Sequence, residues 1–155
     1  MMRIPLTQGK FALVDDSDYE WLNQWKWCAC RQHGSNRWYA MRGARPQILM
    51  HQLILNPPKG MESDHINHDG LDNQRSNLRV CTHSQNQHNR SLQQGGASQF
   101  KGVYWYKQYK KWQVQLGING NRIFLGYFKK EIDAAKAYNK AAIKYFGEFA
   151  RLNDV

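Results

Sequence analysis

The sequence predicts an α+β fold in two parts, and three observations support that prediction. Short runs of alternating apolar and polar residues, typical of strands, occur in both halves of the 155-residue chain. A long segment at 131–147 is rich in helix-forming residues, and a small, polar, glycine-containing stretch at 93–99 is typical of a linker. We therefore expect a first domain at 1–92, a linker at 93–99 and a second domain at 100–155.

The first domain is expected to combine short strands with little helix. Its predicted elements are strands at 10–14, 25–31 and 37–43, a helix from Asp15 or Asp16 to Leu22, a turn at 33–36 and a buried apolar segment at 45–55. The two prolines after Asn56 end that segment, because proline cannot continue regular structure.

The second domain is expected to be a three-stranded antiparallel sheet with one helix packed on it. The predicted strands are 102–107, 112–118 and 122–127, with a tight hairpin turn at Asn119-Gly120-Asn121 and a helix at 131–147. Helical spacing places Ala134, Tyr138, Ala141 and Tyr145 in one row, and we expect this row to face the sheet.

The charge predicts a polyanionic partner. With 22 basic and 12 acidic residues the net charge is +10, and residues 93–155 alone carry 11 basic against 4 acidic side chains, a net of +7. Such an excess favours nucleic acid or an acidic membrane surface. The chain has no run of eighteen apolar residues and no signal-peptide core. We therefore expect double-stranded DNA as the partner, no membrane association and a cytoplasmic protein.

Alternation along the second domain predicts which side chains point away from its helix. The outward set is Tyr104, Tyr106, Gln113, Gln115, Arg122 and Phe124, with Lys101 and Lys107 at the margins. Glutamine and arginine can bind base edges, and a sheet can enter the major groove. An ordinary hydrated sheet face would show the same alternation, but exposed aromatic rings beside a strong positive charge favour a DNA-binding face.

Residues 64–90 are unusually polar and hold four of the six histidines and three aspartates. Residues 61–66 and 77–82 can pair as a two-stranded ribbon, and Thr82 or Ser84 can begin a helix after it. This order of elements is expected to bring Asp64, His65 and Asn86 close together. Carboxylate and amide oxygens suit one Mg²⁺ or Mn²⁺ ion, and an imidazole can take a proton from water. Alternatively, such residues are simply solvated in polar turns.

The three cysteines, Cys28, Cys30 and Cys81, include no CxxC pair. Their odd number argues against a disulfide framework or a four-ligand zinc site. A clip of Cys28 and Cys30 on a metal is conceivable, but we expect buried free thiols in a reducing compartment.

The spacing of Asp64-His65, Asn77 and Asn86 resembles that of the HNH (ββα-metal) endonucleases, most closely the homing enzymes of phages and group I introns. The resemblance implies Asp64 and Asn86 as metal ligands, His65 as the general base and Asn77 as the residue that orients the loop. His83 is an alternative to Asn86. The other histidines named here, His51, His68 and His88, are expected to be structural or to contact phosphate.

Residues 101–153 resemble the AP2 DNA-binding domain of plant transcription factors, which also occurs in phage endonucleases. The matching positions are Gly102-Val103, Trp112, Leu125-Gly126, Phe128, Ala134-Ala135, Ala137-Tyr138, Ala141-Ala142, Gly147 and Leu152-Asn153. The resemblance implies a sheet that reads the major groove. Base-contacting arginines of plant members are replaced by Lys101, Tyr104 and Tyr106, so plant target sequences are not expected.

Together these features predict a homing-type, site-specific DNA endonuclease with a ββα-metal HNH module and an AP2-like anchor. It would act as a monomer or a dimer on DNA and make a nick or a double-strand break. Two alternatives are a DNA-binding regulator with a silent HNH domain and a nuclease of low specificity. The intact Asp64, His65 and Asn86 argue against the first, and the second DNA-binding module argues against the other.

Overall fold

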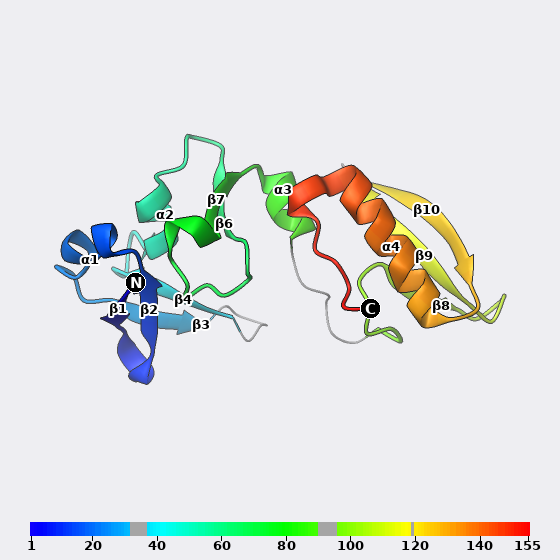
Figure 1. Cartoon of the computed structure of the whole chain (residues 1–155), viewed down its shortest axis with the longest axis horizontal. Helices are drawn as coiled ribbons and strands as arrows, with labels where there is room; N and C mark the ends of the chain where they lie inside the picture. The colour runs from blue at the N-terminus through cyan, green and yellow to red at the C-terminus, as the bar shows by residue number, and fades with distance from the viewer. Residues whose placement is uncertain (32–36, 90–95, 119) are drawn as a thin grey trace. The chain divides into compact units, whose positions relative to one another are not determined.

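The computed structural model describes residues 1–31, 37–89, 96–118 and 120–155. These residues form two compact units, Met1–His83 and Ser84–Val155, whose elements are labelled in Figure 1. The predicted turn at 33–36, residues 93–95 of the predicted linker and Asn119 of the predicted hairpin turn lie outside the described residues. Within the described part of the chain, no helix is long and apolar enough to cross a membrane.

The first unit opens with a hairpin, of which the sequence predicted only the second strand. Strand β1 (Met2–Pro5) pairs antiparallel with β2 (Phe11–Val14), and a 3-10 turn, η1 (Thr7–Gly9), joins them. Alternation along the hairpin buries Ile4, Ala12 and Val14 in the core of the unit. Helix α1 (Asp16–Leu22) follows directly and adds Leu22 to the same core.

A second sheet of three antiparallel strands completes the scaffold of the first unit. It consists of β3 (Cys28–Arg31), β4 (Trp38–Arg42) and β5 (Ile48–Leu49), and helix α2 (Met50–Leu55) continues from β5. The predicted strand at 25–31 is shorter in the structure, where β3 begins at Cys28, and the Trp27 indole before it donates to the Leu22 carbonyl oxygen. Helix α2 ends at Asn56, whose left-handed φ of 42° stops the helix before the two prolines.

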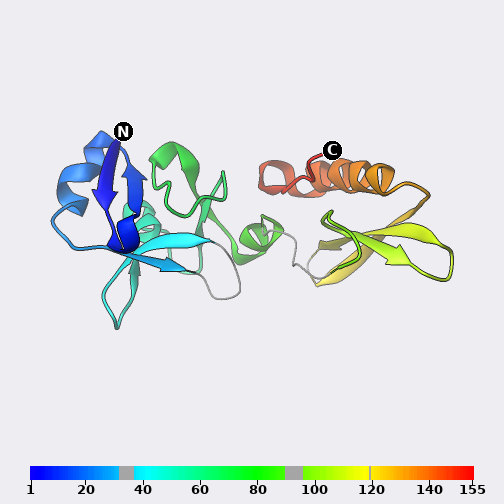
Figure 2. The same cartoon turned by 90° about the horizontal axis from the view of Figure 1, so that it is seen from below.

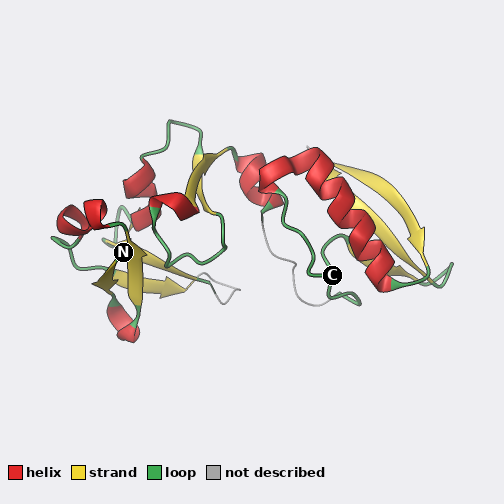
Figure 3. Cartoon of the chain, in the orientation of Figure 1, coloured by secondary structure: helices red, strands yellow, loops and turns green. Residues whose placement is uncertain are grey.

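The predicted polar ribbon is present at the end of the first unit. Strands β6 (Glu62–His65) and β7 (Leu78–Cys81) pair antiparallel, and η2 (Arg75–Asn77) precedes β7. Helix α3 (His83–His88) comes next, and the boundary between the two compact units falls within it. Figure 3 shows the ribbon as two adjacent yellow strands, followed by this short helix in red.

The second unit is a three-stranded antiparallel sheet, as the alternation predicted. It is made of β8 (Val103–Tyr106), β9 (Lys111–Ile118) and β10 (Asn121–Phe128), with β9 in the centre. Helix α4 (Glu131–Phe146) lies over one face and leaves the other bare (Figure 2), and a last 3-10 turn, η3 (Gly147–Phe149), follows it.

The helix row predicted to face the sheet needs one correction. Ala134 and Tyr138 are buried against the sheet, as expected, but Tyr145 is exposed and Phe146 packs on the core instead.

Candidate functional site

The polar ribbon carries the three predicted site residues of the first unit. Asp64 and His65 are the last two residues of β6, and their register partners on β7 are Arg79 and Leu78. Asn77 ends the 3-10 turn just before β7. β6 runs into the connecting loop and β7 runs out of it, so these polar residues lie where the two strands meet the loop. All three predicted residues are more than nine-tenths buried, which is rare for such side chains outside a functional site or a bonded network.

Asn77 joins the two sides of the loop that connects β6 to β7. Its side-chain oxygen accepts a hydrogen bond from the Asn67 backbone N–H at 2.9 Å, and its side-chain nitrogen donates to the Asp72 carbonyl oxygen at 2.8 Å. One amide therefore holds the beginning and the end of the loop at a fixed separation. A residue with only a donor or only an acceptor could not make both bonds.

The same loop is fixed to the N-terminal hairpin and to α1. On β2, the Leu13 backbone N–H donates to the Leu71 carbonyl oxygen, and the Leu13 carbonyl oxygen accepts from the Asn73 N–H, both at 2.8 Å. Asp15 lies at the N-terminal cap position of α1, but its side chain makes no capping hydrogen bond and accepts the Arg75 backbone N–H at 2.7 Å. The N-terminal elements thus buttress the site.

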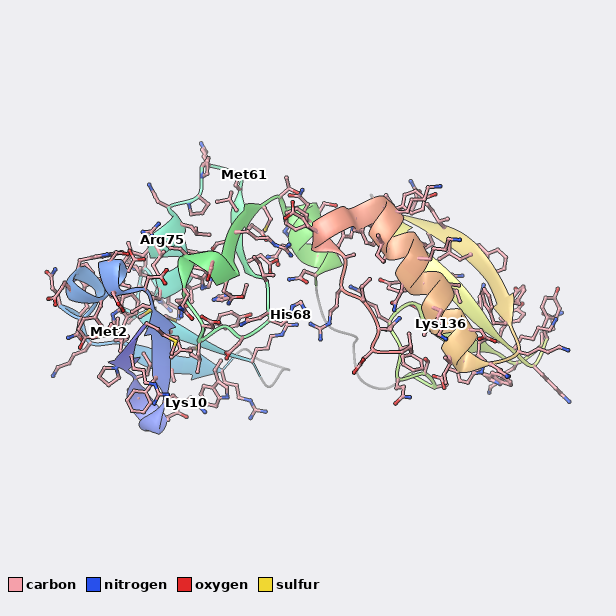
Figure 4. The ribbon with its side chains drawn as sticks, in the orientation of Figure 1. Met2, Lys10, Met61, His68, Arg75 and Lys136 are labelled. Atoms are coloured by element: carbon pink, nitrogen blue, oxygen red, sulfur yellow. The ribbon has the colours of Figure 1, made fainter. Side chains whose placement is uncertain are left out.

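An ion pair reinforces this attachment from α1. Arg75 reaches both carboxylate oxygens of Asp18 at 2.8 Å, and the Trp21 indole donates to the same carboxylate at 3.1 Å. Figure 4 draws Arg75 with its side chain at this end of the unit. The Asp18 side chain is only 3% exposed, so its charge depends on these partners.

The orientation of His65 is set by Asn73, a residue that the sequence reasoning did not single out. The Asn73 side-chain nitrogen donates to the Leu71 carbonyl oxygen at 3.1 Å, which turns its side-chain oxygen toward His65 Nε2 at 3.3 Å. This contact favours the tautomer in which Nε2 carries the proton, because Nε2 then donates to the Asn73 oxygen and Nδ1 keeps the lone pair. Nδ1 is therefore the nitrogen that can accept a proton.

Burial keeps His65 in the neutral form that a base requires. Desolvation lowers the pKa of His65, and this effect outweighs the opposing influences of the Asn73 hydrogen bond and of the carboxylates of Asp64, Asp69 and Asp72. An imidazole with a lowered pKa stays unprotonated at neutral pH and can take a proton from water.

A second histidine, His51 of α2, packs against His65. The two ring centroids lie 4.6 Å apart, and the Tyr39 ring is within 6 Å of both. His51 is 5% exposed, and its Nδ1 has no hydrogen-bond partner among the described residues. Burial, with a smaller contribution from His65, lowers the pKa of His51 to about 3, so this ring is neutral and acts as a packing surface for the base.

Asp64 is held by Arg79 on the opposite strand. Arg79 donates from Nε at 3.0 Å and from a terminal nitrogen at 2.9 Å, both to Oδ2 of the carboxylate. Both side chains are at least 88% buried, so the pair fixes the direction of the carboxylate. Arg79 could have been predicted from the sequence, because it occupies the position that faces Asp64 in the predicted ribbon.

The Asp64 carboxylate suits a divalent metal that is bound by few protein ligands. Among the residues that the structure describes, no three His, Cys, Asp or Glu side chains come together as a metal cage. Mg²⁺ commonly binds through one or two carboxylates, with water and phosphate oxygens completing its shell. The Asp64 carboxylate matches that chemistry. Asn86 itself is partly buried in α3, in the second unit.

His83 and His88 contact other side chains. His83, the alternative ligand, is exposed, and its Nδ1 lies 2.6 Å from a Glu62 carboxylate oxygen. His88 stacks on Phe146 with ring centroids 3.7 Å apart. His68 adopts a left-handed φ of 66° in the loop after β6, where Figure 4 labels it.

The cysteines are three free thiols. The expectation of buried thiols is confirmed for Cys81, whose burial raises the pKa of the thiol to about 11. It is wrong for Cys28, which is exposed on the outer strand β3, while Cys30 is partly buried on the same strand. Alternation along β3 places these two on one face, away from the buried Ala29 between them.

The bare face of the second unit carries the predicted outward residues and two more. We define the open face by the side chains that cross-strand pairing places on the side of the sheet opposite α4: Tyr104, Tyr106, Lys111, Gln113, Gln115, Arg122, Phe124 and Tyr127. Tyr127 was missed because a β-bulge between Phe124 and Gly126 reverses the alternation. Gly126, with a φ of 128°, was the signal for that bulge.

The two lysines predicted at the margins of the sheet face, Lys101 and Lys107, have different surroundings. Lys107 is exposed just beyond β8, as expected. The Lys101 ammonium donates to the His88 carbonyl oxygen at 2.5 Å, and its backbone N–H donates to the Asn153 side chain at 2.6 Å. Lys101 therefore ties segments of the second unit together.

Comparison with known proteins supports the first resemblance. The sequence profile of the HNH endonuclease family matches residues 56–88, which include the ribbon and α3. An HNH endonuclease of Acanthamoeba polyphaga mimivirus, L560, is 31% identical over 152 residues, which cover 96% of this chain and 77% of the viral protein. The chain belongs to the HNH endonuclease family.

The plant AP2 proteins match only a part of this HNH family member. The AP2-like ethylene-responsive transcription factors CRL5 of Oryza sativa subsp. japonica and PLT2 of Arabidopsis thaliana are 43% and 44% identical over 54 residues. Those residues are 34% of this chain but only 8% and 10% of the two plant proteins. The similarity therefore concerns one module.

Proposed function

We propose that this member of the HNH family is a site-specific DNA endonuclease of the homing type, as found in phages and group I introns. The observation that carries the proposal is the His65 imidazole, which is buried, has a lowered pKa and lies with Nε2 against the Asn73 side-chain oxygen, next in sequence to the Asp64 carboxylate. A buried base next to a hard metal ligand is the combination that hydrolysis of a phosphodiester requires.

In the proposed reaction, Nδ1 of His65 accepts a proton from a water molecule. The oxygen of that water attacks the phosphorus, and the bond from phosphorus to the leaving sugar oxygen breaks. Asp64 and Asn86 would hold one Mg²⁺ or Mn²⁺ ion, which when bound stabilises charge on the phosphate and on the leaving oxygen. Arg79 keeps the Asp64 carboxylate in place, and Asn77 keeps the loop closed.

The second unit is proposed to anchor the enzyme on an adjacent stretch of duplex DNA. Residues 93–155 carry a net charge of +7, which supports affinity for the phosphate backbone. The proposed contacts to DNA come from Lys107 and from the open face, with Tyr104, Tyr106, Gln113, Gln115, Arg122 and Phe124 as the residues first expected there. Backbone contacts position a protein, whereas contacts to base edges specify the sequence.

A cleavage experiment distinguishes this proposal from the two alternatives. Wild-type protein and His65→Ala are incubated with a pool of long duplexes and Mg²⁺ or Mn²⁺, and the cut ends are sequenced. The proposal predicts ends at one or a few sequences for the wild type and none for the variant. Scattered ends would indicate a nuclease of low specificity. Binding without any cut by the wild type would indicate a silent HNH domain.

A further inference from the structure

The open face of the second unit presents an unusual combination of side chains for a DNA-binding sheet. Cross-strand pairing places Gln113 between Tyr104 and Tyr127, and places Gln115 opposite Phe124. Tyr104 and Phe124 are 53% and 52% exposed. The two glutamines make no side-chain hydrogen bond to the described residues. Each glutamine therefore lies beside at least one exposed aromatic ring, with its amide available to a ligand.

The charges of the sheet narrow the choice of base pair. Residues 93–130 contain no aspartate or glutamate, and Arg122 is the single arginine of that segment. In the major groove, acidic side chains accept from cytosine and arginine binds guanine, whereas glutamine binds adenine and apolar groups contact the thymine methyl group. Two glutamines with aromatic neighbours match A·T pairs better than G·C pairs.

The arrangement of the rings argues against a platform for single strands. Tyr106, Tyr109 and Tyr127 lie with centroids 5.0–5.4 Å apart and their planes inclined by 40–78°. Phe124 meets Tyr127 at 59°. Rings that are tilted or edge to face relative to one another do not form the flat, parallel surface on which unpaired bases stack. Their edges and the amides between them suit the wall of a duplex groove.

We propose that the open face reads A·T base pairs in the major groove, with Gln113 and Gln115 on adenine and the adjacent aromatic rings on thymine methyl groups. This inference rests on the proposed function, because it assumes that the second unit binds duplex DNA. It adds the class of target sequence, an A·T-rich segment beside the cleavage position, with Arg122 as the contact for a guanine at its edge.

The test begins with selection of duplexes from a random pool by the full wild-type chain in EDTA, so that cleavage does not interfere. The enriched site is expected to contain a segment rich in A·T pairs. Thymines of that segment are then replaced one at a time by uracil, which lacks only the methyl group. Loss of one buried methyl group is worth about 0.8 kcal/mol, so we expect affinity to fall about fourfold at each contacted thymine.

Two variants assign the contacts to side chains. Phe124→Ala should bind the thymine and uracil versions of its site equally, and Gln115→Ala should lose about tenfold or more of the preference for A·T over G·C at one position. Tyr145→Ala is the matched control, since Tyr145 is an exposed aromatic residue on α4, which covers the other face. It should leave both preferences unchanged.

The outcomes separate the inference from the proposed function. Duplex binding with a G·C-rich enriched site, or with no sensitivity to uracil, would overturn A·T reading while leaving the endonuclease proposal intact. Tighter binding to single strands than to duplexes would overturn it in favour of base stacking. Absence of duplex binding would remove both the inference and the proposed anchor.

Discussion

At the scale of single residues, the orientation of the proposed general base, His65, depends on a buried neighbour. Asn73 is fully buried, donates to the Leu71 carbonyl oxygen and accepts from His65. Its amide cannot reverse without placing a donor against Nε2 and an acceptor against a carbonyl oxygen. The contact with Asn73 thereby favours the tautomer of His65 in which Nδ1 is the nitrogen that receives the proton.

Asn73→Leu should lower the single-turnover cleavage rate by about tenfold to a hundredfold, as is common when a supporting hydrogen bond to a site residue is lost. Asn73→Asp keeps an oxygen acceptor and should retain more of the rate, with a pH profile moved upward because the added charge raises the pKa of His65. The ¹⁵N shifts of the imidazole report the tautomer directly, without metal. An unchanged Nε2–H tautomer in Asn73→Leu would show that Asn73 does not select it.

His51 gives the first unit a specific sensitivity to acid. Its pKa is about 3 in the folded state, against about 6.5 in the unfolded chain. Below pH 6.5, His51 therefore binds a proton in the unfolded state but stays neutral in the folded state. The free energy of unfolding then falls by about 1.4 kcal/mol for each pH unit until the pH approaches 3. His51→Phe keeps a ring against His65 and removes this proton.

Urea unfolding of wild type and His51→Phe at pH 7.5, 6 and 4.5 measures the effect. The free energy of unfolding of the variant should rise relative to wild type by about 2–3 kcal/mol between pH 7.5 and 4.5. A constant difference across this range would mean that His51 is protonated in the folded state as readily as in the unfolded one.

At the scale of elements, the site depends on the N-terminal hairpin and α1 as much as on the ribbon. Leu13 of β2 and Asp15 before α1 bond to the backbone of the loop, and Asp18 of α1 pairs with Arg75. These contacts join residues 57–60 positions apart in the sequence. The N-terminal hairpin and α1 therefore support the loop, whether or not they also contact DNA.

Arg75→Ala should destabilise the first unit by about 1–3 kcal/mol, because it leaves the buried Asp18 carboxylate without its ionic partner. Hydrogen exchange should increase first at the amides of the loop, where the pair attaches it. Lys59→Ala, which removes an exposed charge in the same unit, is the control and should change stability by less than about 0.5 kcal/mol. Equal stability of the two variants would contradict the bracing role of the ion pair.

The local elements were predictable from the sequence, whereas the groups that orient the base were not. The β6–β7 ribbon and the three-stranded sheet follow from alternation and turn residues, which are short-range signals. His51 and Tyr39 meet His65 only through tertiary packing, and nothing in their own segments indicates that contact. The face of Tyr127 depends on one bulge, which a strict two-residue period cannot represent.

At the scale of the whole molecule, charge and chemistry are divided between the two parts of the chain. Residues 1–92 carry a net charge of +3 and hold the buried aspartates and histidines Asp18, His51, Asp64 and His65, whereas residues 93–155 carry +7 and present the open face. Binding and hydrolysis should therefore be separable by substitution. Most acidic side chains lie in residues 1–92. Their repulsion of DNA phosphate can be reduced there by a bound divalent cation.

The most direct test of the central claim compares His65→Ala with His83→Ala, using wild-type protein as the reference. Single-turnover cleavage of a duplex bearing the selected site is measured in Mg²⁺, and binding of the same duplex is measured in EDTA. We predict that His65→Ala binds like wild type but cleaves on the order of a hundredfold or more slowly. His83→Ala should cleave within a few-fold of wild type, since its imidazole is 71% exposed and bonded to Glu62. Undiminished cleavage by His65→Ala would contradict the assignment of the base.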